Sequence, residues 1–444
     1  MRNLMQEDIV TMVQEEDVEF IRLQFTDILG DLKNMALTSS QLSRILKNEC
    51  KFDGSAIEGF AEIDEPDLYL HPITGTFETF PWRPQQGKVA RMVCDVYRQD
   101  GQPYEGDPRY VLRRAVDRLA EMGYGFEVGP ECEFFLFNTD ENTMPTTKTT
   151  EQAGFFDVGP LDCGENARRD VVLALEDMGL TVESSFHEKS PAQHEICFRY
   201  DDPLNTADNI MTFKLAVRTI ARRHGLHATF MPKPLENVNG SGMRLSMNLT
   251  KEGRNIMRDM NDPDLMSMEA YYFLGGLMKH AKGITAIANP LVNSYKRLDC
   301  DNDVSTAITW SKCNRSTLFR IPNIRRGEGT RVEMISPDPA ANPYLLFALC
   351  LEAGMDGIKN KIMPSEKMEN NLFGVEDVVK QSLGIESLPR TLSDALDELE
   401  NDPILMSALG EHVAKKYIAI KRREIERYRK SVTQWELDEY LNKY

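Results

Sequence analysis

The sequence predicts an α+β protein with two domains. Its 444 residues exceed what one small hydrophobic core usually holds. The first hundred residues mix strands with short helices, and a strong helix start follows at Asp107-Pro108, where Asp is a preferred N-cap and Pro fits the first turn. Beyond this point helices and strands mix without a regular βαβ repeat, which favours α+β over a doubly wound α/β fold. We therefore predict a small domain over residues 1–105 and a larger domain over residues 106–444.

The small domain is predicted to combine a hairpin, a further strand and two short helices. Two β-favouring runs are separated by a turn at Asp27–Gly30, which is typical of a β-hairpin. A loop rich in Gly, Glu and Asp opens at Phe52-Asp53-Gly54-Ser55 and ends near Tyr69. In chain order the predicted elements are a helix at Gln6–Val13, strands at Val18–Phe25 and Leu32–Leu37, a helix at Ser40–Asn48 and a half-buried strand at Lys88–Tyr97.

The larger domain contains the clearest helix of the chain, from about Asp208 to His224. Its apolar residues recur at helical spacing and form one stripe, and Gly225 ends it. The helix that starts at Asp107 is predicted to run to Met122, with Gly123 closing it. Further helices are predicted at Leu265–Ile284, Pro343–Met355 and Val413–Tyr428.

A predicted strand over Gly129–Phe137, with Gly129-Pro130 as its entry turn, carries two acids. Side chains two positions apart on a strand share a face, so Glu131 and Glu133 point the same way. Adjacent carboxylates beside apolar residues repel each other and resist desolvation, and a hard divalent cation such as Mg²⁺ between them removes both penalties. The alternative, on this stretch alone, is an exposed face with two solvated acids.

Composition excludes several other classes of protein. The formal net charge of −18 argues against a broad nucleic-acid surface or an anionic-membrane patch. No apolar run approaches membrane-spanning length, and the first residues lack the apolar core of a signal peptide. The eight cysteines never form a CxxC pair, which predicts a reducing cytoplasm and argues against a zinc ribbon or a disulfide framework. There is no HExxH, no GxxxxGK[ST] and no GxGxxG after a strand, so any nucleotide has to be bound in another way.

Four further stretches carry polar groups that a reaction can use. His187-Glu188 ends one strand and Gln193-His194-Glu195 begins the next, so a hairpin brings Glu188 and Glu195 close together. Asn239–Met243 is a Gly-rich loop where backbone can approach a ligand.

The other two stretches supply guanidinium groups suited to phosphate or carboxylate oxygens. They are Asn314–Ser316 with Arg320–Pro322, and the strand-like run Arg331–Ile335, on which Glu333 shares a face with both ends. Each stretch alone is weak evidence.

The order of these motifs along the whole chain resembles the glutamine synthetase family, most closely its bacterial type I branch. The motifs are Phe52-Asp53-Gly54-Ser55, Glu131-x-Glu133, His187-Glu188, Gln193-His194-Glu195, Met231-Pro232-Lys233-Pro234, Asn239-Gly240-Ser241-Gly242, Asn293-Ser294-Tyr295-Lys296-Arg297, Asn314-Arg315-Ser316, Arg331-Val332-Glu333 and Asp338-Pro339-Ala340-Ala341-Asn342-Pro343-Tyr344.

The resemblance implies a small β-grasp-like N-terminal domain and a catalytic α+β domain with a mostly antiparallel, curved sheet. It implies ligation of ammonia to glutamate, driven by ATP through a γ-glutamyl phosphate, with Mg²⁺ or Mn²⁺ bound. It also implies a dodecamer of two hexameric rings, in which the Asp53 loop reaches into the active site of the neighbouring subunit.

The resemblance further implies a role for each site residue. In-line phosphoryl transfer requires metal ions and arginines, because they spread the negative charge of the transition state. The first metal site maps onto Glu133, Glu188 and Glu195, and the second onto Glu131, a histidine and Glu333. Catalytic positions map onto Asp53, Asp303 and Arg315, phosphate and nucleotide positions onto Arg315, Arg320, Arg331 and Glu183, and glutamate-holding positions onto Asn239, Gly240 and Arg297.

Several positions depart from the family pattern. Arg244 stands where the histidine of the second metal site is expected, and a guanidinium has no lone pair to offer a cation. We expect Arg244 to lie against Glu131 and Glu333 as a fixed positive charge. The other departures are Ile335 for a second arginine that grips the substrate α-carboxylate, Asp303 for a flap glutamate, Phe155 for a tyrosine near the ammonium pocket, and Ala56 and Asn248 for serines.

Three hypotheses follow from these departures. The first is an ATP-dependent ligase whose acid or amine substrate has shifted away from glutamate and ammonia. The second is an authentic glutamine synthetase with a modified second metal site. The third is a catalytically impaired paralogue that keeps the oligomer and nucleotide binding in a regulatory role.

Overall fold

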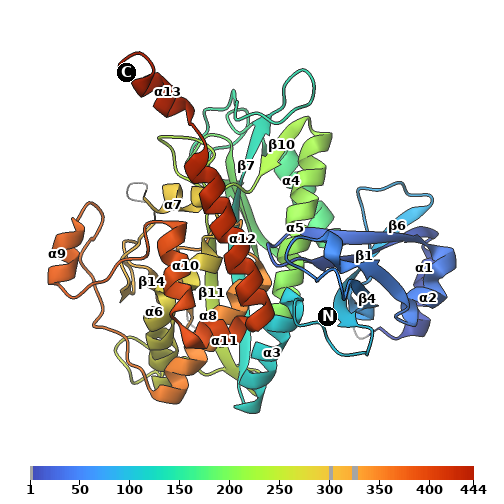
Figure 1. The fold of residues 1–444 in the computed structure, drawn as a ribbon, viewed down its shortest axis with the longest axis horizontal. Helices are drawn as coiled ribbons and strands as arrows, with labels where there is room; N and C mark the ends of the chain where they lie inside the picture. Colours follow the sequence, from blue (N-terminus) through green and yellow to red (C-terminus); the bar gives the residue numbers. More distant parts are fainter. Residues whose placement is uncertain (1–3, 300–303, 323–328) are drawn as a thin grey trace.

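The computed structural model describes residues 4–299, 304–322 and 329–444 of the chain. Figure 1 shows a small N-terminal domain, in blue, beside a larger body in which long helices surround a second sheet. Two helices, α9 (Asp377–Ser382) and α13 (Gln434–Tyr440), project from this body. Within the described residues no helix combines the length and the apolar character needed to cross a membrane.

The N-terminal domain contains a six-stranded sheet in the described part of the chain, with strand order β2-β1-β6-β4-β3 and β5 paired to β6. The first two strands form the expected antiparallel hairpin, and β1 also pairs in parallel with β6. The strands are β1 (Val18–Thr26), β2 (Leu32–Thr38), β3 (Cys50–Asp53), β4 (Asp67–Pro72), β5 (Glu78–Thr79) and β6 (Lys88–Arg98), and the helices are α1 (Gln6–Glu15) and α2 (Leu42–Leu46).

One prediction for this domain was wrong. Phe52 and Asp53 do not open a loop but end β3, which pairs antiparallel with β4 from Cys50 to Asp53. The loop begins one residue later, at Gly54, because the side chain of Asp53 caps a short 3₁₀ turn by accepting a hydrogen bond from the Ser55 backbone N–H at 2.9 Å. Strand pairing across the sheet outweighed the turn-forming composition of this stretch.

The larger body is built on a nine-stranded sheet, as counted over the described residues, with order β13-β14-β15-β11-β7-β9-β8. Its pairs are antiparallel except that between β13 and β14. The strands are β7 (Gly125–Asn138), β8 (Val182–His187), β9 (Gln193–Phe198), β10 (Leu226–Thr229), β11 (Met243–Lys251), β12 (Arg254–Asn255), β13 (Trp310–Ser311), β14 (Phe319–Arg320) and β15 (Val332–Met334).

The predicted entry turn of the central strand was also wrong, because Gly129 and Pro130 lie inside β7. On one side the strand pairs with β11 over its first half. On the other side, Pro130 falls between an isolated bridge at Val128 and the pairing with β9 that starts at Glu131. Proline has no backbone N–H to donate, and it is tolerated here because β7 changes its pairing partner on that side at this residue.

The two faces of β7 are chemically different. Cys132, Phe134 and Leu136 belong to the main hydrophobic core, whereas Phe135 and Phe137 pack in a separate small cluster on the opposite side. Because successive side chains alternate, the acids of this strand share the second face. The sheet thus turns its carboxylates away from the main core.

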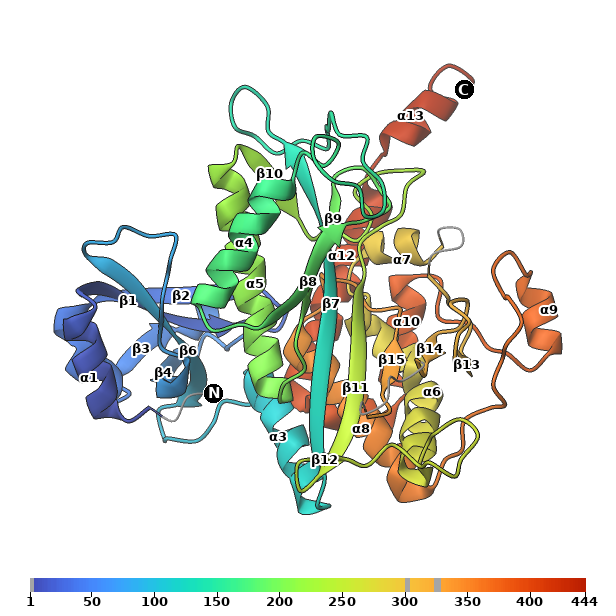
Figure 2. The same ribbon diagram turned by 180° about the vertical axis from the view of Figure 1, so that it is seen from behind.

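Helices cover the core face, and Figure 2 shows α4 and α5 running beside β7, β8 and β9. The predicted helices are present, within a few residues of their expected bounds. The helices are α3 (Pro108–Glu121), α4 (Glu165–Asp177), α5 (Pro203–Arg223), α6 (Met268–Ala288), α7 (Val292–Leu298), α8 (Pro343–Asn360), α10 (Leu392–Glu400), α11 (Pro403–Leu409) and α12 (Glu411–Lys430).

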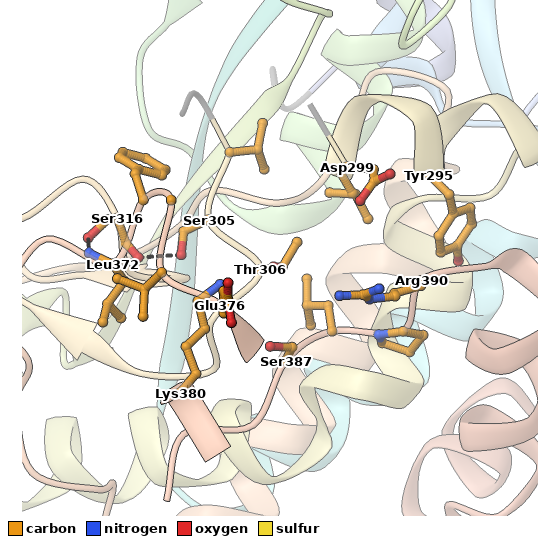
Figure 3. Close-up of a pocket in the computed structure, with 17 residues that line it drawn as sticks. Tyr295, Asp299, Ser305, Thr306, Ser316, Leu372, Glu376, Lys380, Ser387 and Arg390 are labelled. Carbon is orange, nitrogen blue, oxygen red and sulfur yellow. Dashed lines mark hydrogen bonds between the residues drawn. The ribbon is translucent and has the colours of Figure 1, made fainter. Parts of the chain in front are cut away.

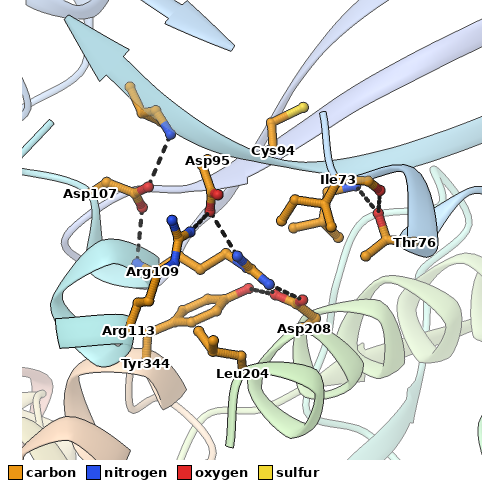
Figure 4. A network of polar contacts seen from close by, with 12 residues as sticks. Ile73, Thr76, Cys94, Asp95, Asp107, Arg109, Arg113, Leu204, Asp208 and Tyr344 are labelled. Carbon is orange, nitrogen blue, oxygen red and sulfur yellow. Dashed lines mark hydrogen bonds and ion pairs between the residues drawn. The ribbon is translucent and has the colours of Figure 1, made fainter. Parts of the chain in front are cut away.

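A buried polar network joins the first sheet to this body (Figure 4). Arg109, at the start of α3, donates from Nε and Nη2 to the two carboxylate oxygens of Asp208 on α5, both at 3.0 Å. Its Nη1 donates to Asp95 of β6 at 2.7 Å, and the Tyr344 hydroxyl donates to Asp208 at 2.7 Å. One guanidinium therefore connects β6 of the first sheet to helices α3 and α5 of the larger body.

Replacing Asp208 by asparagine is expected to lower the free energy of unfolding by about 3–5 kcal/mol, because it leaves the buried Arg109 without its bidentate partner. Urea unfolding followed by circular dichroism measures the change. The control is Asp170→Asn, which removes the exposed contacts of Asp170 with Arg169 and His224 and is expected to change stability by less than about 1 kcal/mol. Equal effects of the two substitutions would contradict this account of the network.

Candidate active site

Three carboxylates converge on the face of the sheet that points away from the main core. Oxygen atoms of Glu133, Glu188 and Glu195 all lie within 4.8 Å of one another. The register of β7 against β9 places Glu133 directly opposite Glu195. Glu188 joins them because the β8–β9 turn closes through its backbone N–H, which donates to the Gln193 carbonyl at 2.8 Å.

The electrostatics of this cluster favour a cation. Burial, reinforced by the charge of Glu133, raises the pKa of Glu195 to about 9. Burial, reinforced by the charge of Glu188, raises the pKa of Glu133 to about 7. In both residues, burial and the neighbouring carboxylates outweigh the hydrogen bonds and positive charges that stabilise the ionised form. An all-oxygen donor set of this kind fits a hard divalent ion such as Mg²⁺ or Mn²⁺.

Gln193 links this cluster to the Gly-rich loop. Its amide donates to Oε2 of Glu133 at 3.1 Å and to the Gly240 carbonyl at 3.0 Å. The Gly242 N–H also donates to Oε2 of Glu133, at 2.7 Å. The sequence interpretation quoted Gln193 without giving it a role, although its position two residues before Glu195 on the same strand placed it on the same face.

The Gly-rich loop lies directly against Arg297, which is buried at the end of α7. Nη1 of Arg297 donates to the Ser336 carbonyl at 2.7 Å and to the Pro337 carbonyl at 3.3 Å. A Cβ atom at Gly242 would collide with this guanidinium, and one at Gly240 would collide with the Pro232 carbonyl. Glycine is required at both positions for the loop to approach so closely.

A second group of charges surrounds Arg244 on β11. Nη1 of Arg244 lies 2.7 Å from Oε2 of Glu131, the residue opposite it in the ladder. Although burial lowers the pKa of Arg244, the negative charges of Glu131 and Glu333 raise it overall. Burial raises the pKa of Glu131, and Arg244 opposes that rise. The guanidinium thus stays charged and compensates the acids around it.

Glu333 is buried between two further arginines. Its Oε2 accepts from Nε of Arg320 at 2.7 Å and lies 2.6 Å from Nη2, while its Oε1 accepts from Nε of Arg331 at 3.3 Å. Arg331 also stacks over the ring of Tyr200, with its Cζ 5.9 Å from the ring centroid. Both oxygens of Glu333 therefore face guanidinium groups, which compete with any cation for this carboxylate.

A second divalent ion does not fit the residues around Arg244. Glu131 is paired to Arg244, and Glu333 is held by Arg320 and Arg331. A charged guanidinium repels a cation and offers it no lone pair. The first group of three carboxylates fits a metal ion, and the second group does not.

A buried polar cluster supports the hairpin of Glu188 and Glu195 from behind. Nε2 of His187 lies 2.7 Å from Oε1 of Glu151, although the geometry is not that of a hydrogen bond. Nη1 of Arg168 lies 2.8 Å from Nδ1 of His194 and donates to Asp162 at 2.7 Å. Glu151 and Asp162 come from a stretch without regular structure. No periodic pattern marks such residues, so sequence reasoning missed them.

A hollow of about 330 Å³ adjoins the end of α7. Figure 3 shows Tyr295 and Asp299 on one side of it and Ser305, Ser316 and Arg390 among its other lining residues. Ser316 anchors one wall, since its Oγ accepts from the Leu372 N–H at 2.8 Å. The loop that carries Arg315 is therefore fixed at the position next to that arginine.

Comparison with known proteins identifies the architecture. Residues 17–99 match the family described as glutamine synthetase, beta-Grasp domain, and residues 105–440 match glutamine synthetase, catalytic domain. The chain belongs to the glutamine synthetase family. It is 54% identical over 438 residues to glutamine synthetase of Clostridium saccharobutylicum, covering 99% of each chain, and 49% identical to that of Staphylococcus aureus strain Mu50, covering 100% of this chain and 99% of the other.

Solved structures give the same result. Glutamine synthetase of Plasmodium falciparum superposes with a TM-score of 0.89 at 25% identity, covering 99% of each chain. A structure titled as a GmaS/ADP complex superposes with a TM-score of 0.88 at 31% identity, covering 98% of this chain and 99% of the other. The predicted family and the predicted fold, a β-grasp domain followed by a catalytic α+β domain with a curved sheet, are confirmed. The chain is a glutamate–ammonia ligase-type enzyme, and its family uses ATP and divalent metal ions.

The remaining predicted site residues lie at the edges of the glutamine synthetase-like site or apart from it. Glu183 is exposed on β8, Arg315 is exposed in the loop before β14, and the backbone carbonyl of Asn239 accepts from Ser190 at 3.1 Å. Asp53 is exposed on the N-terminal domain and, within the described residues, has no hydrogen bond or ion pair with the carboxylate cluster. Asp303 lies outside the described residues.

The positions that depart from the glutamine synthetase pattern are also placed. Ile335 is half-buried just beyond β15, two residues from Glu333. Phe155 is exposed and packs against Phe156 and Phe186. Ala56 is exposed in the 3₁₀ turn after Asp53, and Asn248 lies on β11 with its side-chain oxygen buried and without a hydrogen bond.

Proposed function

We propose that this chain is an ATP-dependent ligase that forms an amide from a carboxylic acid and ammonia or an amine, with its substrate pair shifted away from plain glutamate and ammonia. The observation that carries this proposal is the convergence of Glu133, Glu188 and Glu195 beside a group of arginines. Such a set spreads the negative charge that develops during phosphoryl transfer. The family membership supplies the reaction class.

One divalent ion, Mg²⁺ or Mn²⁺, is assigned to Glu133, Glu188 and Glu195. When bound, it supplies charge neutralisation to the phosphate oxygens of ATP. The second family position is assigned to Arg244, which places a permanent positive charge between Glu131 and Glu333. This enzyme then works with one metal ion and one guanidinium at the two positions.

ATP is the proposed nucleotide. Arg315, Arg320 and Arg331 carry positive charge suited to phosphate oxygens, and Glu183 is assigned to the nucleotide side. Nucleotide binding requires Arg320 and Arg331 to exchange part of their contact with Glu333 for phosphate. The related structure titled as a GmaS/ADP complex supports binding of an adenine nucleotide by this chain.

The acid substrate is assigned to the Gly-rich loop and Arg297, where Asn239 and Gly240 present backbone groups. Ile335 stands where the family pattern has a second arginine, and a site built for a charged pair loses about 2–5 kcal/mol when one partner is removed. Phe155 and Ala56 remove hydroxyl groups from the proposed amine side. Together these changes support a less polar amine and an acid with an altered α-carboxylate.

Phosphate release from ATP with Mg²⁺ or Mn²⁺ tests the proposal. Purified protein is supplied first with glutamate and ammonium, then with panels of amines and of acids. Turnover only with another pair supports the proposal, and full turnover with glutamate and ammonium contradicts the shift of substrate. Silence with every pair, in assembled protein that binds ATP, would favour the alternative of a catalytically impaired paralogue with a regulatory or nucleotide-binding role.

We also propose that the chain assembles as a homo-oligomer, a dodecamer of two hexameric rings in which Asp53 completes the site of a neighbour. Asp53 has no described contact with the carboxylate cluster of its own chain. Trp435 on α13 is 63% exposed, and Leu441, directly after this helix, is 70% exposed. Exposed apolar groups on a projecting helix are typical of an interaction surface.

Mixing two inactive variants tests this arrangement. Asp53→Ala and Glu195→Gln are each expected to be inactive alone, because each lacks one half of every site. Co-assembled at equal amounts, they form some sites with both halves intact, and we expect roughly a quarter of wild-type activity from random pairing of subunits. Activity no greater than that of either variant alone, in particles of full mass by mass photometry, would place both residues in one subunit's site.

A further inference from the structure

A hollow of about 600 Å³ lies between the N-terminal hairpin β1–β2, helix α5 and helix α12, away from the carboxylate cluster. Its volume is in the range of small-molecule sites. Although the chain has a formal net charge of −18, the described residues that line this hollow include five cationic side chains and two carboxylates. They are Arg22, Lys33, Lys214, Arg218 and Lys421 with Asp31 and Glu424.

Two of the five cations are neutralised by the protein itself. Lys33 lies 3.0 Å from Asp27 and 3.6 Å from Asp31, and Lys421 donates to Glu424 at 2.8 Å. These pairs use the carboxylates that face the hollow. Within the described residues, no hydrogen bond or ion pair joins an acid to any of the other three cations.

The contacts of Arg22 and Arg218 are with aromatic rings. The Cζ of Arg22 lies 5.9 Å from the centroid of the Phe80 ring, and that of Arg218 lies 5.2 Å from the centroid of the Phe230 ring. Over the described ranges neither guanidinium has a hydrogen bond or an ion pair. An arginine stacked in this way keeps its N–H groups available for a planar or tetrahedral oxyanion.

Lys214 is the buried member of this group, with 6% of its surface exposed. Its Nζ donates to the Ala341 carbonyl at a long 3.4 Å, which leaves two of its three N–H bonds without an acceptor in the described structure. Burial, reinforced by the positive charge of Arg218, lowers the pKa of Lys214 to about 8. Burying an ammonium group without an acid beside it costs free energy, so an anion that binds next to Lys214 is strongly stabilised.

The rest of the wall combines the polar side chains of Gln24, Asn34 and Thr229 with apolar side chains, among them Leu29, Met211, Leu215 and Leu291. These apolar side chains can pack against the carbon atoms of an organic ligand, whereas a bare inorganic ion offers them no apolar surface. We propose that this hollow binds a small organic anion carrying at least two acidic groups, carboxylate or phosphate, through Arg22, Lys214 and Arg218. This site is distinct from the proposed ATP and acid positions, and it joins the N-terminal domain to the catalytic body.

Calorimetric titration of the full-length protein, in buffer without metal or nucleotide, tests the site. The two probes are citrate, for a carboxylate ligand, and fructose 1,6-bisphosphate, for a phosphate ligand, and the tighter probe identifies the acidic group. Arg218→Met and Lys214→Met are each expected to weaken that probe tenfold or more, since a hydrogen bond to a charged group contributes about 1.5–3 kcal/mol. Arg222→Met, a charge removed one turn further along α5 and outside the hollow, is expected to bind like wild type.

An active-site variant separates this site from the ATP position. Arg320→Gln is expected to leave binding of the probe unchanged. Binding lost in Arg320→Gln but kept in Arg218→Met would overturn the proposal. The absence of measurable heat from either probe at about 10 mM would also overturn it, because a specific site is saturated well below that concentration. Because Arg218 is exposed, Arg218→Met is expected to keep the fold, and circular dichroism verifies this. This variant therefore tests the site even if Lys214→Met does not fold.

Discussion

Replacing Glu195 by glutamine is expected to abolish tight Mn²⁺ binding and to reduce turnover by about a thousandfold or more, because the metal loses one of three carboxylates that it shares with Glu133 and Glu188. Glutamine keeps the shape of the side chain, so the strand pairing of β9 is preserved. Calorimetric titration with Mn²⁺ measures the affinity, and the phosphate-release assay measures turnover. The control is Glu141→Gln, an exposed acid in the loop after β7.

The same substitution is expected to change how the metal-free protein responds to pH. The pKa of Glu195 is raised to about 9 and that of Glu133 to about 7, both chiefly by burial. The folded protein therefore holds protons that the unfolded chain has already released above about pH 5. The stability from these groups is fully present below the unfolded pKa and is lost as the pH rises through 7 and 9. In EDTA, the Tm of the wild type is expected to fall between pH 6 and pH 9.

Glu195→Gln removes the group with the higher pKa, so its Tm is expected to fall less over the same range. Mn²⁺ acts in the opposite direction, because it displaces protons from the carboxylates, and its apparent affinity is expected to rise about tenfold per pH unit for each proton displaced. Thermal melts at pH 6, 7, 8 and 9, with EDTA or with Mn²⁺, give both slopes. Parallel slopes for wild type and Glu195→Gln in EDTA would show that this carboxylate is not the titrating group.

Strand periodicity and a turn predicted two separate pairs of acids, whereas only the resemblance to the glutamine synthetase family joined Glu133, Glu188 and Glu195 into one group. A spacing of two residues places Glu131 and Glu133 on one face of β7, and the turn between His187 and Gln193 brings Glu188 beside Glu195. These are local relationships. The helix at Asp208–His224 was predicted for the same reason, from a stripe and a terminal glycine.

The pairing of Glu333 with arginines could not be predicted in this way. It depends on the register of β14 against β15, which sets Arg320 opposite Glu333, and β14 is only two residues long. A strand this short has no period to read. Glu151 and Asp162 present the same difficulty, because only tertiary packing brings them to His187 and Arg168. Sequence patterns placed the residues that lie on long strands and missed the partners that come from loops.

Restoring two family residues is expected to return activity toward glutamate and ammonium. We expect Arg244→His combined with Ile335→Arg to raise glutamate- and ammonium-dependent turnover about 10–100-fold, since one added charged hydrogen bond contributes about 1.5–3 kcal/mol. Histidine at position 244 supplies a ring nitrogen that can bind a metal ion and frees Glu131 from its ion pair. Arginine at position 335, two residues from Glu333, adds a charge for the acid substrate.

Metal stoichiometry separates the two contributions. Equilibrium dialysis is expected to find one Mn²⁺ per chain in the wild type and two in Arg244→His, whereas Arg244→Leu, which removes the charge without adding a ligand, stays at one. Arg244→Leu also leaves the buried Glu131 without its ion pair, so the metal-free form of this variant is expected to be less stable than that of the wild type. A single Mn²⁺ in Arg244→His, with turnover unchanged in the double variant, would mean that the guanidinium is not what prevents binding of a second metal ion. Glu131 and Glu333 would then not be ligands of a second metal site.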